Sequence, residues 1–500
     1  MDIVFCIIPK LDPYAPTTGP ALLKSHCEAA GFSACVKDYN IDLYNYLKKQ
    51  NLHKSYFFDN DNAFISWFWP TDYEYPNEWY ELYDVIEPKM KEWVNELKRI
   101  NPTWVGISML SATSMCVGRK LCELLREHAP KIKIVLGGAA VRNETKIWLD
   151  NGWADCYVYG DGEFPIIDVL NGNFDAPGIN TITPFQVENL NDTLIPNYDD
   201  INWNEYEFGH DMSPVYITAS RGCVKKCTFC DVPILWPTYK WRTADHVFAE
   251  IELLYTKHNR RMFRFTDSLV NGSASQFREL LKKIIEFNKT KEYDHEEIRW
   301  HSQWIVRPRS QMTEEDFKLM ADSNVNHVDI GLESFSESVR WHMGKKFTDD
   351  DLWWNLEMMY KYNIHYTLLM ITGYPTETEE DHQITLDSIK RMNELGYISK
   401  GGNMPDVAYM SFGNMMMLQP DYKIYKMIKD DPTFVDDSIG WSYKDNTPEV
   451  RIKRHIEAND LVEEYTGRGM SWLSKKQLRR NLAEIEREKK MRENENHRKY

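Results

Sequence analysis

Six apolar segments alternate with helical segments between residues 213 and 430, and this alternation constrains the fold more than any other feature. The expected strands are short and rich in apolar residues, and they cover 215–218, 262–266, 298–303, 327–331, 366–371 and 407–412. Repeated strand–helix units build a parallel sheet, and six of them predict a partial barrel of the (β/α)6 type. Ligands of such barrels bind at the carboxyl ends of the strands, so the loops there are the first candidates for a site.

A second alternation occupies residues 1–171, with strands expected at 3–8, 33–37, 104–109, 132–136 and 156–159. It predicts a Rossmann-like, doubly wound parallel sheet. Residues 51–95 form an aromatic insertion that is too long for an ordinary connection, and it would be either a lid or a local aromatic core. We expect residues 172–212 to form a linker and residues 431–500 to form a helical C-terminal extension.

Cys223, Cys227 and Cys230 follow the first strand of the expected barrel within eight residues. Three thiolates in one loop can hold three irons of a cubane cluster, whose usual protein complement is four cysteines. A structural zinc site needs four ligands, and no second Cys or His pair lies nearby. Nine cysteines in 500 residues are too sparse, and odd in number, for a disulfide framework. The loop therefore favours a [4Fe–4S] cluster with one open iron.

The spacing Cys-x3-Cys-x2-Cys resembles the signature of the radical S-adenosylmethionine (SAM) superfamily. The resemblance implies that SAM binds the open iron and that one electron cleaves it to methionine and a 5′-deoxyadenosyl radical. By position after the strands, it also implies SAM contacts from Phe229, Asp267, Ser302, Gln303, Arg307, Glu333, Ser334, Gly373 and Glu377. Asp267 stands in Thr-Asp-Ser, where the family has Gly-Gly-Glu, so this contact departs from the family pattern.

The loops of residues 1–171 resemble those of the cobalamin-binding domain that often precedes a radical SAM barrel. The resemblance rests on a Ser-rich loop after the third strand, Gly-Gly after the fourth and Gly-x-Gly-Glu after the fifth. The residues that it implies near cobalamin are Thr17, Thr18, Ser108, Leu110, Ser111, Gly137, Gly138, Gly160 and Glu163. Many cobalamin domains bind cobalt through the His of Asp-x-His-x-x-Gly, a run that this chain lacks, so no cobalt ligand is assigned. A Rossmann-like domain with an empty or repurposed cleft is the alternative.

These features predict a radical SAM enzyme, and cobalamin-dependent C-methylation of an unactivated carbon is the favoured reaction. The alternatives are cobalamin-independent cyclisation or rearrangement, methylthio transfer, and a non-enzymatic iron–sulfur redox protein. Methylthio transfer would require a second cysteine-held cluster, and the six other cysteines are scattered. The expected substrate is a small molecule or a peptide. Lys225 and Lys226 would favour the reduced cluster and dock an acidic electron donor such as flavodoxin or ferredoxin, or they are exposed lysines without a role.

The net charge of −16 argues against a nucleic-acid partner, and the basic tail predicts a solvated charged helix. No apolar run reaches about 18 residues, so no membrane span is expected. Met1 directly precedes an expected strand, so we expect no signal peptide. A reducing cytoplasm suits both the free thiols and an oxygen-sensitive cluster.

Overall fold

The computed structural model describes residues 1–58, 75, 77–111, 114–141, 145–207, 214–398, 408–437, 440–467 and 475–497. The middle of the predicted aromatic insertion, residues 59–74, lies outside the described residues. The chain forms two compact units, which comprise residues 1–219 with 240–264 and residues 220–239 with 265–500. The domain limits at residues 171, 212 and 430 stay predictions.

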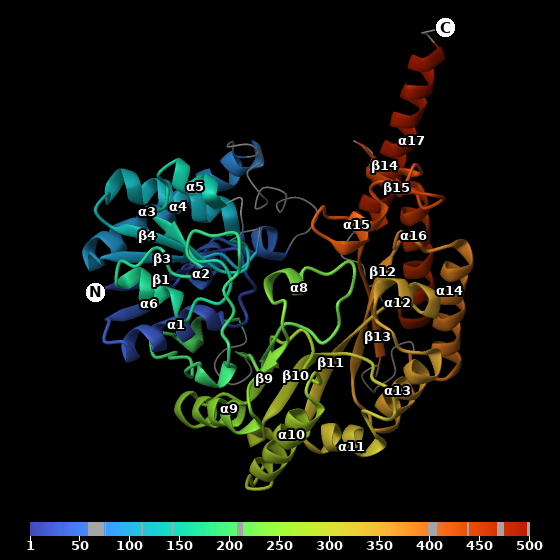
Figure 1. The fold of residues 1–500 in the computed structure, drawn as a ribbon, viewed down its shortest axis with the longest axis horizontal. Coiled ribbons are helices and arrows are strands. Elements are labelled where there is room, and N and C mark those ends of the chain that lie inside the picture. The colour runs from blue at the N-terminus through green and yellow to red at the C-terminus, as the bar shows by residue number, and fades with distance from the viewer. Residues whose placement is uncertain are drawn as a thin grey trace. The chain divides into compact units, whose positions relative to one another are not determined.

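The first unit contains a five-stranded sheet in the order β2-β1-β3-β4-β5 (Figure 1). Its strands are β1 (Ile3–Ile7), β2 (Ala34–Asp38), β3 (Trp104–Ser108), β4 (Lys133–Gly137) and β5 (Cys156–Tyr157). All neighbouring pairs are parallel. Every residue of β1 is buried, as expected of an interior strand in a parallel sheet that is covered on both faces. The predicted doubly wound sheet is confirmed.

The helices that follow these strands are α1 (Thr18–Ala29), α2 (Tyr39–Lys49), α3 (Asn77–Ile100), α4 (Met115–His128), α5 (Lys146–Asp150) and α6 (Pro165–Leu170). The side chain of Asp38 caps α2 by accepting a 2.9 Å hydrogen bond from the backbone N–H of Ile41. Cys27 of α1 and Ile166 of α6 pack in one apolar core with β1, β2 and β4. The helix α9 (Ala244–His258) belongs to the same unit.

The second sheet has six strands in the order β13-β12-β11-β10-β9-β6. They are β6 (Val215–Ile217), β9 (Met262–Phe265), β10 (Arg299–Trp304), β11 (Val325–Glu333), β12 (Tyr366–Thr372) and β13 (Ala408–Met415). The pairs β10–β11, β11–β12 and β12–β13 are parallel. The strands cross the sheet in chain order, as a partial barrel requires, so the predicted fold class is confirmed.

Besides α9, the described residues between the cysteines and β13 form six α-helices, which are α8 (Val232–Leu235), α10 (Ala274–Asn288), α11 (Glu314–Asp322), α12 (Glu337–Met343), α13 (Asp349–Lys361) and α14 (Glu379–Glu394). Capping boxes begin three of them, at Thr313, Thr348 and Thr378, each paired with an Asp three residues later. The two-residue strands β7 (Ser220–Arg221) and β8 (Lys240–Trp241) flank the cysteines in sequence.

After β13 the chain continues through α15 (Lys423–Ile428) to an antiparallel hairpin of β14 (Phe434–Asp437) and β15 (Gly440–Tyr443). Two helices follow, α16 (Pro448–Thr466) and α17 (Lys475–His497), so the predicted extension is helical after an initial hairpin. Among the helices that the structure describes, none has the length and apolar character needed to cross a membrane.

Candidate active site

The cysteine loop, defined as residues 222–230, follows β7. Gly222 begins it with a φ of +80°, and a Cβ there would lie 2.8 Å from the carbonyl oxygen of Thr238. Only glycine fits this left-handed turn without strain. Cys223, Cys227 and Cys230 are partly buried, and none forms a disulfide. The turn therefore presents three free thiols from one short loop.

The environment of these thiols fits an iron–sulfur cluster. Burial raises the pKa of Cys230 to about 12, and the nearby Cys227 and Cys223 shift it in the same direction. Burial also raises the pKa of Cys227, although the ammonium of Lys345 opposes this shift. Such thiols are protonated at neutral pH until a bound metal displaces their protons. The backbone N–H of Lys225 lies 3.4 Å from the Sγ of Cys223, and such hydrogen bonds tune a cluster.

A buried ion pair accompanies the cysteine loop. The Nζ of Lys345 lies 3.2 Å from the Oε1 of Glu333 and 2.7 Å from the carbonyl oxygen of Gly331. Glu333 has a φ of +67°, which is rare for a residue other than glycine, and the register of β11 against β12 shifts there. Burial lowers the pKa of Lys345, but Glu333 and Cys227 more than offset this, so its pKa is raised. Lys345 therefore stays charged between a carboxylate and the cysteine loop.

Residues that follow β11, β12 and β13 hold the cysteine loop in place. The backbone N–H of Ile424 donates to the carbonyl oxygen of Thr228 at 2.9 Å, and the hydroxyl of Thr228 lies 2.7 Å from that of Tyr374. Phe229 meets Tyr374 edge to face, with ring centroids 6.4 Å apart. Phe229 also packs against a buried apolar cluster of Val339, Met343, Tyr374, Met416, Ile424, Ile428, Trp441 and Tyr443. Phe229 is thus fixed by distant parts of the chain.

The turn after β12 is built against α16. Gly373 has a φ of +80°, and a Cβ there would lie 2.3 Å from the Cγ and Cδ of Arg451. Its backbone N–H donates to Glu377 Oε2 at 2.9 Å, and Glu377 Oε1 lies 3.2 Å from Arg454 Nη1. Burial raises the pKa of Glu377 to about 7, against the lowering effects of the Gly373 N–H and Arg454. Two arginines of α16 therefore support the Gly-Tyr-Pro-Thr-Glu turn.

Three of the predicted SAM contacts are buried and have hydrogen-bond partners within the protein. Asp267 accepts a hydrogen bond from the hydroxyl of Ser220. The hydroxyl of Ser302 donates to the carbonyl oxygen of the next residue at 3.1 Å, and that of Ser334 accepts from the backbone N–H two residues later at 3.1 Å. These side chains lie at the predicted strand ends, and their hydrogen bonds help to shape the loops there.

Gln303 and Arg307 are more open to a ligand. Gln303 is exposed, on the face of β10 opposite its buried neighbours. Arg307 donates to the carbonyl oxygen of Gly272 and to Gln311 Oε1, both at 2.7 Å. Its Nε is buried without a hydrogen-bond partner among the described residues. A buried N–H of this kind needs an acceptor, which a bound ligand can supply.

Four residues that fix this site were not predicted from the sequence, namely Lys345, Tyr374, Arg451 and Arg454. Tyr374 lies inside the Gly-Tyr-Pro-Thr-Glu turn, so the position of that turn was an available signal. The other three lie on segments without a recognisable motif. Only their tertiary contacts reveal them.

The residues predicted near cobalamin lie at the carboxyl ends of β3 and β4, in the loops that follow β1, β3, β4 and β5, or at the start of α1. The carboxyl ends of parallel strands share one edge of the sheet, which is where such sheets bind ligands. The Oγ1 of Thr17 is buried without a partner among the described residues. The hydroxyl of Thr18 donates to the carbonyl oxygen of Tyr216 at 3.0 Å and accepts from the hydroxyl of Tyr198 at 3.2 Å. Thr17, but not Thr18, thus has a hydroxyl available to a ligand.

The glycines of these loops have two different roles. A Cβ at Gly138 or Gly160 would lie 2.3 or 2.2 Å from a backbone oxygen of a neighbouring loop, and both have a positive φ. A Cβ at Gly137 would meet nothing within 4 Å, and Leu110 is 48% exposed. The remaining predicted contacts are partly or fully buried, and they are Ser108, Ser111 and Glu163. Open space, an exposed apolar side chain and an unpartnered hydroxyl fit a large ligand such as cobalamin.

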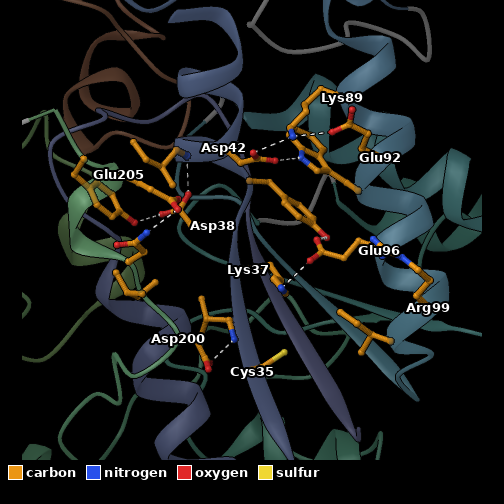
Figure 2. Close-up of a pocket in the computed structure, with 18 of the residues that line it drawn as sticks. Cys35, Lys37, Asp38, Asp42, Lys89, Glu92, Glu96, Arg99, Asp200 and Glu205 are labelled. Carbon is orange, nitrogen blue, oxygen red and sulfur yellow. Dashed lines mark hydrogen bonds and ion pairs between the residues drawn. The ribbon is translucent and has the colours of Figure 1, made fainter. Parts of the chain in front are cut away.

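A separate pocket of about 600 Å³ lies beside β2 in the first unit (Figure 2). Lys37 pairs with Glu96 at 2.7 Å, and Lys89 pairs with Asp42 at 3.0 Å. Burial raises the pKa of Asp38 to about 6. None of the predicted site residues lines this pocket. Its lysines are paired with carboxylates of the pocket itself, which is typical of a structural ion-pair network.

Two family models match successive parts of the chain. The family model of the radical SAM superfamily matches residues 217–389, and that of the B12 binding domain matches residues 81–170. A Pyrococcus horikoshii protein named as an uncharacterized methyltransferase is 22% identical over 315 residues, which are 59% of this chain and 66% of that protein. The tRNA-2-methylthio-N(6)-dimethylallyladenosine synthase of Petrotoga mobilis is 22% identical over 293 residues, 56% of this chain and 63% of that protein. The chain thus spans less than two thirds of either curated relative.

The fold is similar to that of TsrM from Kitasatospora setae, a radical SAM methyltransferase solved with cobalamin and a [4Fe–4S] cluster bound. The TM-score is 0.59 at 14% identity, and the likeness covers 90% of this chain and 80% of that chain. The two matched families support the predicted cofactors, which are a [4Fe–4S] cluster, SAM and cobalamin. Residues 217–389 thus match a radical SAM domain, and a match to the B12 binding domain, residues 81–170, precedes it in the sequence.

Proposed function

We propose that the protein is a radical SAM enzyme that uses cobalamin to methylate an unactivated carbon of its substrate. The observation that carries this proposal is the set of three free thiols beside the buried pair Lys345–Glu333, in a chain that also has a B12 binding domain. When bound, the cluster with SAM supplies one-electron chemistry, and cobalamin supplies a methyl carrier.

In this proposal Cys223, Cys227 and Cys230 hold the cluster as thiolates. The ammonium of Lys345 offsets part of their negative charge, and a positive charge near a cluster favours its reduced state. Lys345 is fixed by its contact with Glu333, so this charge is positioned before any ligand binds.

We assign Glu333 to the amino or ribose groups of SAM, and Arg307 to an acceptor on the same ligand through its unpartnered Nε. Phe229 would form an apolar wall beside SAM, and Gly373 would allow close approach of the backbone. Gln303 would add a polar contact. The other predicted SAM residues support the shape of the site through their own hydrogen bonds, and they are Asp267, Ser302, Ser334 and Glu377.

Thr17, Leu110 and Gly137 would line cobalamin at the carboxyl edge of the five-stranded sheet, because they present an unpartnered hydroxyl, an apolar surface and open space. Gly138 and Gly160 would contribute by allowing the loops to pack closely. The other residues that we propose to lie near cobalamin are Thr18, Ser108, Ser111 and Glu163.

We propose that Lys225 and Lys226 meet an acidic electron donor such as flavodoxin or ferredoxin. Lys226 is exposed and donates one hydrogen bond to the carbonyl oxygen of Pro237, which leaves further donors for a partner, whereas Lys225 is partly buried. We also propose a cytoplasmic location, because its reducing conditions preserve free thiols. The substrate would be a small molecule or a peptide.

Methylthio transfer, the reaction in the name of the Petrotoga relative, is the less favoured alternative. The six cysteines outside the cysteine loop are spread over five strands and helices of the first unit, and only Cys116 and Cys122 share one; the six are Cys6, Cys27, Cys35, Cys116, Cys122 and Cys156. They form no second cysteine loop among the described residues.

Anaerobic reconstitution with iron and sulfide, followed by SAM and dithionite, tests the activity. We expect 5′-deoxyadenosine from the wild-type protein and none from Cys227→Ala. Cys35→Ala is the matched control, because this thiol lies in β2 outside the cysteine loop, and it should leave SAM cleavage unchanged. Intact SAM in the presence of a fully assembled cluster would contradict the proposal.

Cobalamin is tested separately by adding hydroxocobalamin and recording its absorption on the protein before and after reduction. We expect about one cobalamin per chain, as the B12 binding domain implies. A protein that cleaves SAM but binds no cobalamin would be a cobalamin-independent enzyme. Cyclisation or rearrangement would then become the leading reaction.

A further inference from the structure

Two histidines and an aspartate meet on one face of the six-stranded sheet. His301 lies two residues before Gln303 on β10, and burial alternates along β11 from His327 through Asp329 to Glu333. Side chains two residues apart on a strand point to the same face. The three residues therefore share the face whose carboxyl end carries Gln303 and Glu333.

The donor atoms of the three side chains converge. The Nε2 of His301 lies 2.9 Å from Oδ2 of Asp329, and the Nε2 of His327 lies 3.5 Å from Oδ1 of the same carboxylate. The two imidazole rings meet edge to face, with centroids 5.1 Å apart. The hydroxyl oxygen of Thr367 on β12 is a fourth polar atom in this group, 2.8 Å from the Nε2 of His327. One ligand atom from each of His301, His327 and Asp329 can be chosen so that all lie within 4.8 Å of one another.

The distances of 2.9 and 3.5 Å from the two imidazole nitrogens to the oxygens of Asp329 are close to the separations of donors that share one metal ion. Donors about 2.1 Å from a metal lie roughly 3.0 Å apart in an octahedral arrangement and roughly 3.4 Å apart in a tetrahedral one. Imidazole suits zinc and iron, whereas Mg²⁺ and Ca²⁺ prefer oxygen ligands alone. Two imidazoles and one carboxylate also leave coordination positions open, as in catalytic zinc sites and non-haem iron sites.

We propose that His301, His327 and Asp329 bind a divalent transition-metal ion, such as Zn²⁺ or Fe²⁺, at a site separate from the cysteine loop. Along the strands, two residues or about 7 Å separate His301 from Gln303, and four residues or about 13 Å separate Asp329 from Glu333. An ion there would lie at these distances from the SAM end of the sheet, on the same face. Its open positions would hold a carboxylate or another anionic oxygen of the substrate, an assignment that rests on the proposed function.

Equilibrium dialysis against micromolar Zn²⁺, followed by elemental analysis, tests the site on the full chain with its cluster assembled. Assembly of the cluster occupies the three thiols of the cysteine loop, so these do not compete for zinc. We expect about one zinc per chain and a loss of affinity of roughly tenfold or more in His301→Gln and in Asp329→Asn. His295→Gln is the control, because this histidine lies outside the sheet, and it should bind zinc like the wild type.

Circular dichroism of each variant establishes that it is folded, and His327→Gln replaces any variant that is not. Absence of stoichiometric zinc, or zinc binding that all three substitutions leave unchanged, would overturn the proposal in favour of a hydrogen-bonded His–Asp–His group without an ion. SAM cleavage measured on the same preparations separates the two proposals. Cleavage without zinc binding rejects the metal site alone, and zinc binding without cleavage rejects the proposed function alone.

Discussion

The loops at the carboxyl ends of the two sheets differ in how far the protein satisfies its own polar groups. Around the cysteine loop, the Lys345 ammonium, the Glu377 carboxylate and the Thr228 hydroxyl all have partners within the protein. At the edge of the five-stranded sheet, the Thr17 hydroxyl has none among the described residues, and Leu110 is exposed.

This difference separates a site that is built before its ligands bind from a surface that its ligand completes. A preformed site loses geometry when one partner is removed, and the loss appears in the free energy of unfolding. A surface completed by a ligand loses affinity instead, and the stability of the ligand-free protein changes little. The two regions should therefore respond differently to substitution.

Lys345→Met has the largest expected effect and tests the preformed site. Methionine retains much of the aliphatic stem but leaves the buried Glu333 without its cation, so we expect the free energy of unfolding to fall by about 3–5 kcal/mol. The amount of iron bound per chain should fall with it. Denaturant unfolding followed by circular dichroism and iron analysis provide the measurements. Lys346→Met is the matched control at an exposed neighbour and should cost less than about 0.5 kcal/mol. Equal free energies of unfolding of the two variants would show that the ion pair does not stabilise the folded site.

Acidification tests the contact between α16 and β12. The ring of His455 is buried, which lowers its pKa to about 4 from 6.5, and its Nδ1 lies 3.2 Å from the hydroxyl of Thr372. The unfolded chain takes up this proton at higher pH than the folded chain. Stability from this group is therefore complete above pH 6.5 and falls by about 3 kcal/mol as the pH drops to 4. Urea midpoints across this window should fall less steeply in His455→Gln than in the exposed control His295→Gln. Parallel pH profiles of the two variants would contradict the prediction.

Gly373→Ala tests how closely α16 supports the turn after β12. The substitution combines a left-handed φ with a Cβ 2.3 Å from Arg451, so we expect it to cost about 2–3 kcal/mol. Gly396→Ala shares the left-handed φ, but its nearest neighbour is 3.8 Å away, and it should cost about 1 kcal/mol. On an Arg451→Ala background, the cost of Gly373→Ala should approach that of Gly396→Ala, as thermal unfolding can show. An unchanged cost on that background would exclude crowding by Arg451.

Thr17→Val has the smallest expected effect on stability and tests the ligand-completed surface. It removes a buried hydroxyl that has no partner among the described residues, so the ligand-free protein should be no less stable. Hydroxocobalamin affinity, measured by absorption titration, should fall about fivefold through the loss of one hydrogen bond. Thr18→Val should show the opposite pattern. It loses its hydrogen bonds with Tyr216 and Tyr198, so the stability should fall by about 1 kcal/mol, whereas hydroxocobalamin affinity should change little. Identical behaviour of the two variants would remove the distinction between the regions.

The alternation of strands and helices predicts both sheets, because it follows from local periodicity and chain connectivity. The loops that carry the site follow from topology, since parallel strands place their carboxyl ends together. The alternation of side chains along a strand also distinguishes two of the predicted SAM contacts. Ser302 and Gln303 are neighbours on β10, so their side chains point to opposite faces, and the structure leaves only Gln303 open.

The supporting contacts could not be predicted, because they depend on tertiary packing. Arg451 and Arg454 lie on α16, and nothing in the sequence connects that helix with the turn at Gly373. The proposed metal site depends on strand register, which pairs His301 with His327. A shift of one residue would turn these side chains to opposite faces, and periodicity alone does not fix the register between two given strands.

The hydrogen bond between Ile424 and Thr228 has a consequence for the order of events during protein synthesis. Chains emerge from the ribosome N-terminus first, so Thr228 appears roughly 200 residues before the partner that fixes it. During that interval the cysteine thiols are present, but the support of their loop is incomplete. Full support of the cysteine loop therefore follows the synthesis and folding of the segment that carries Ile424.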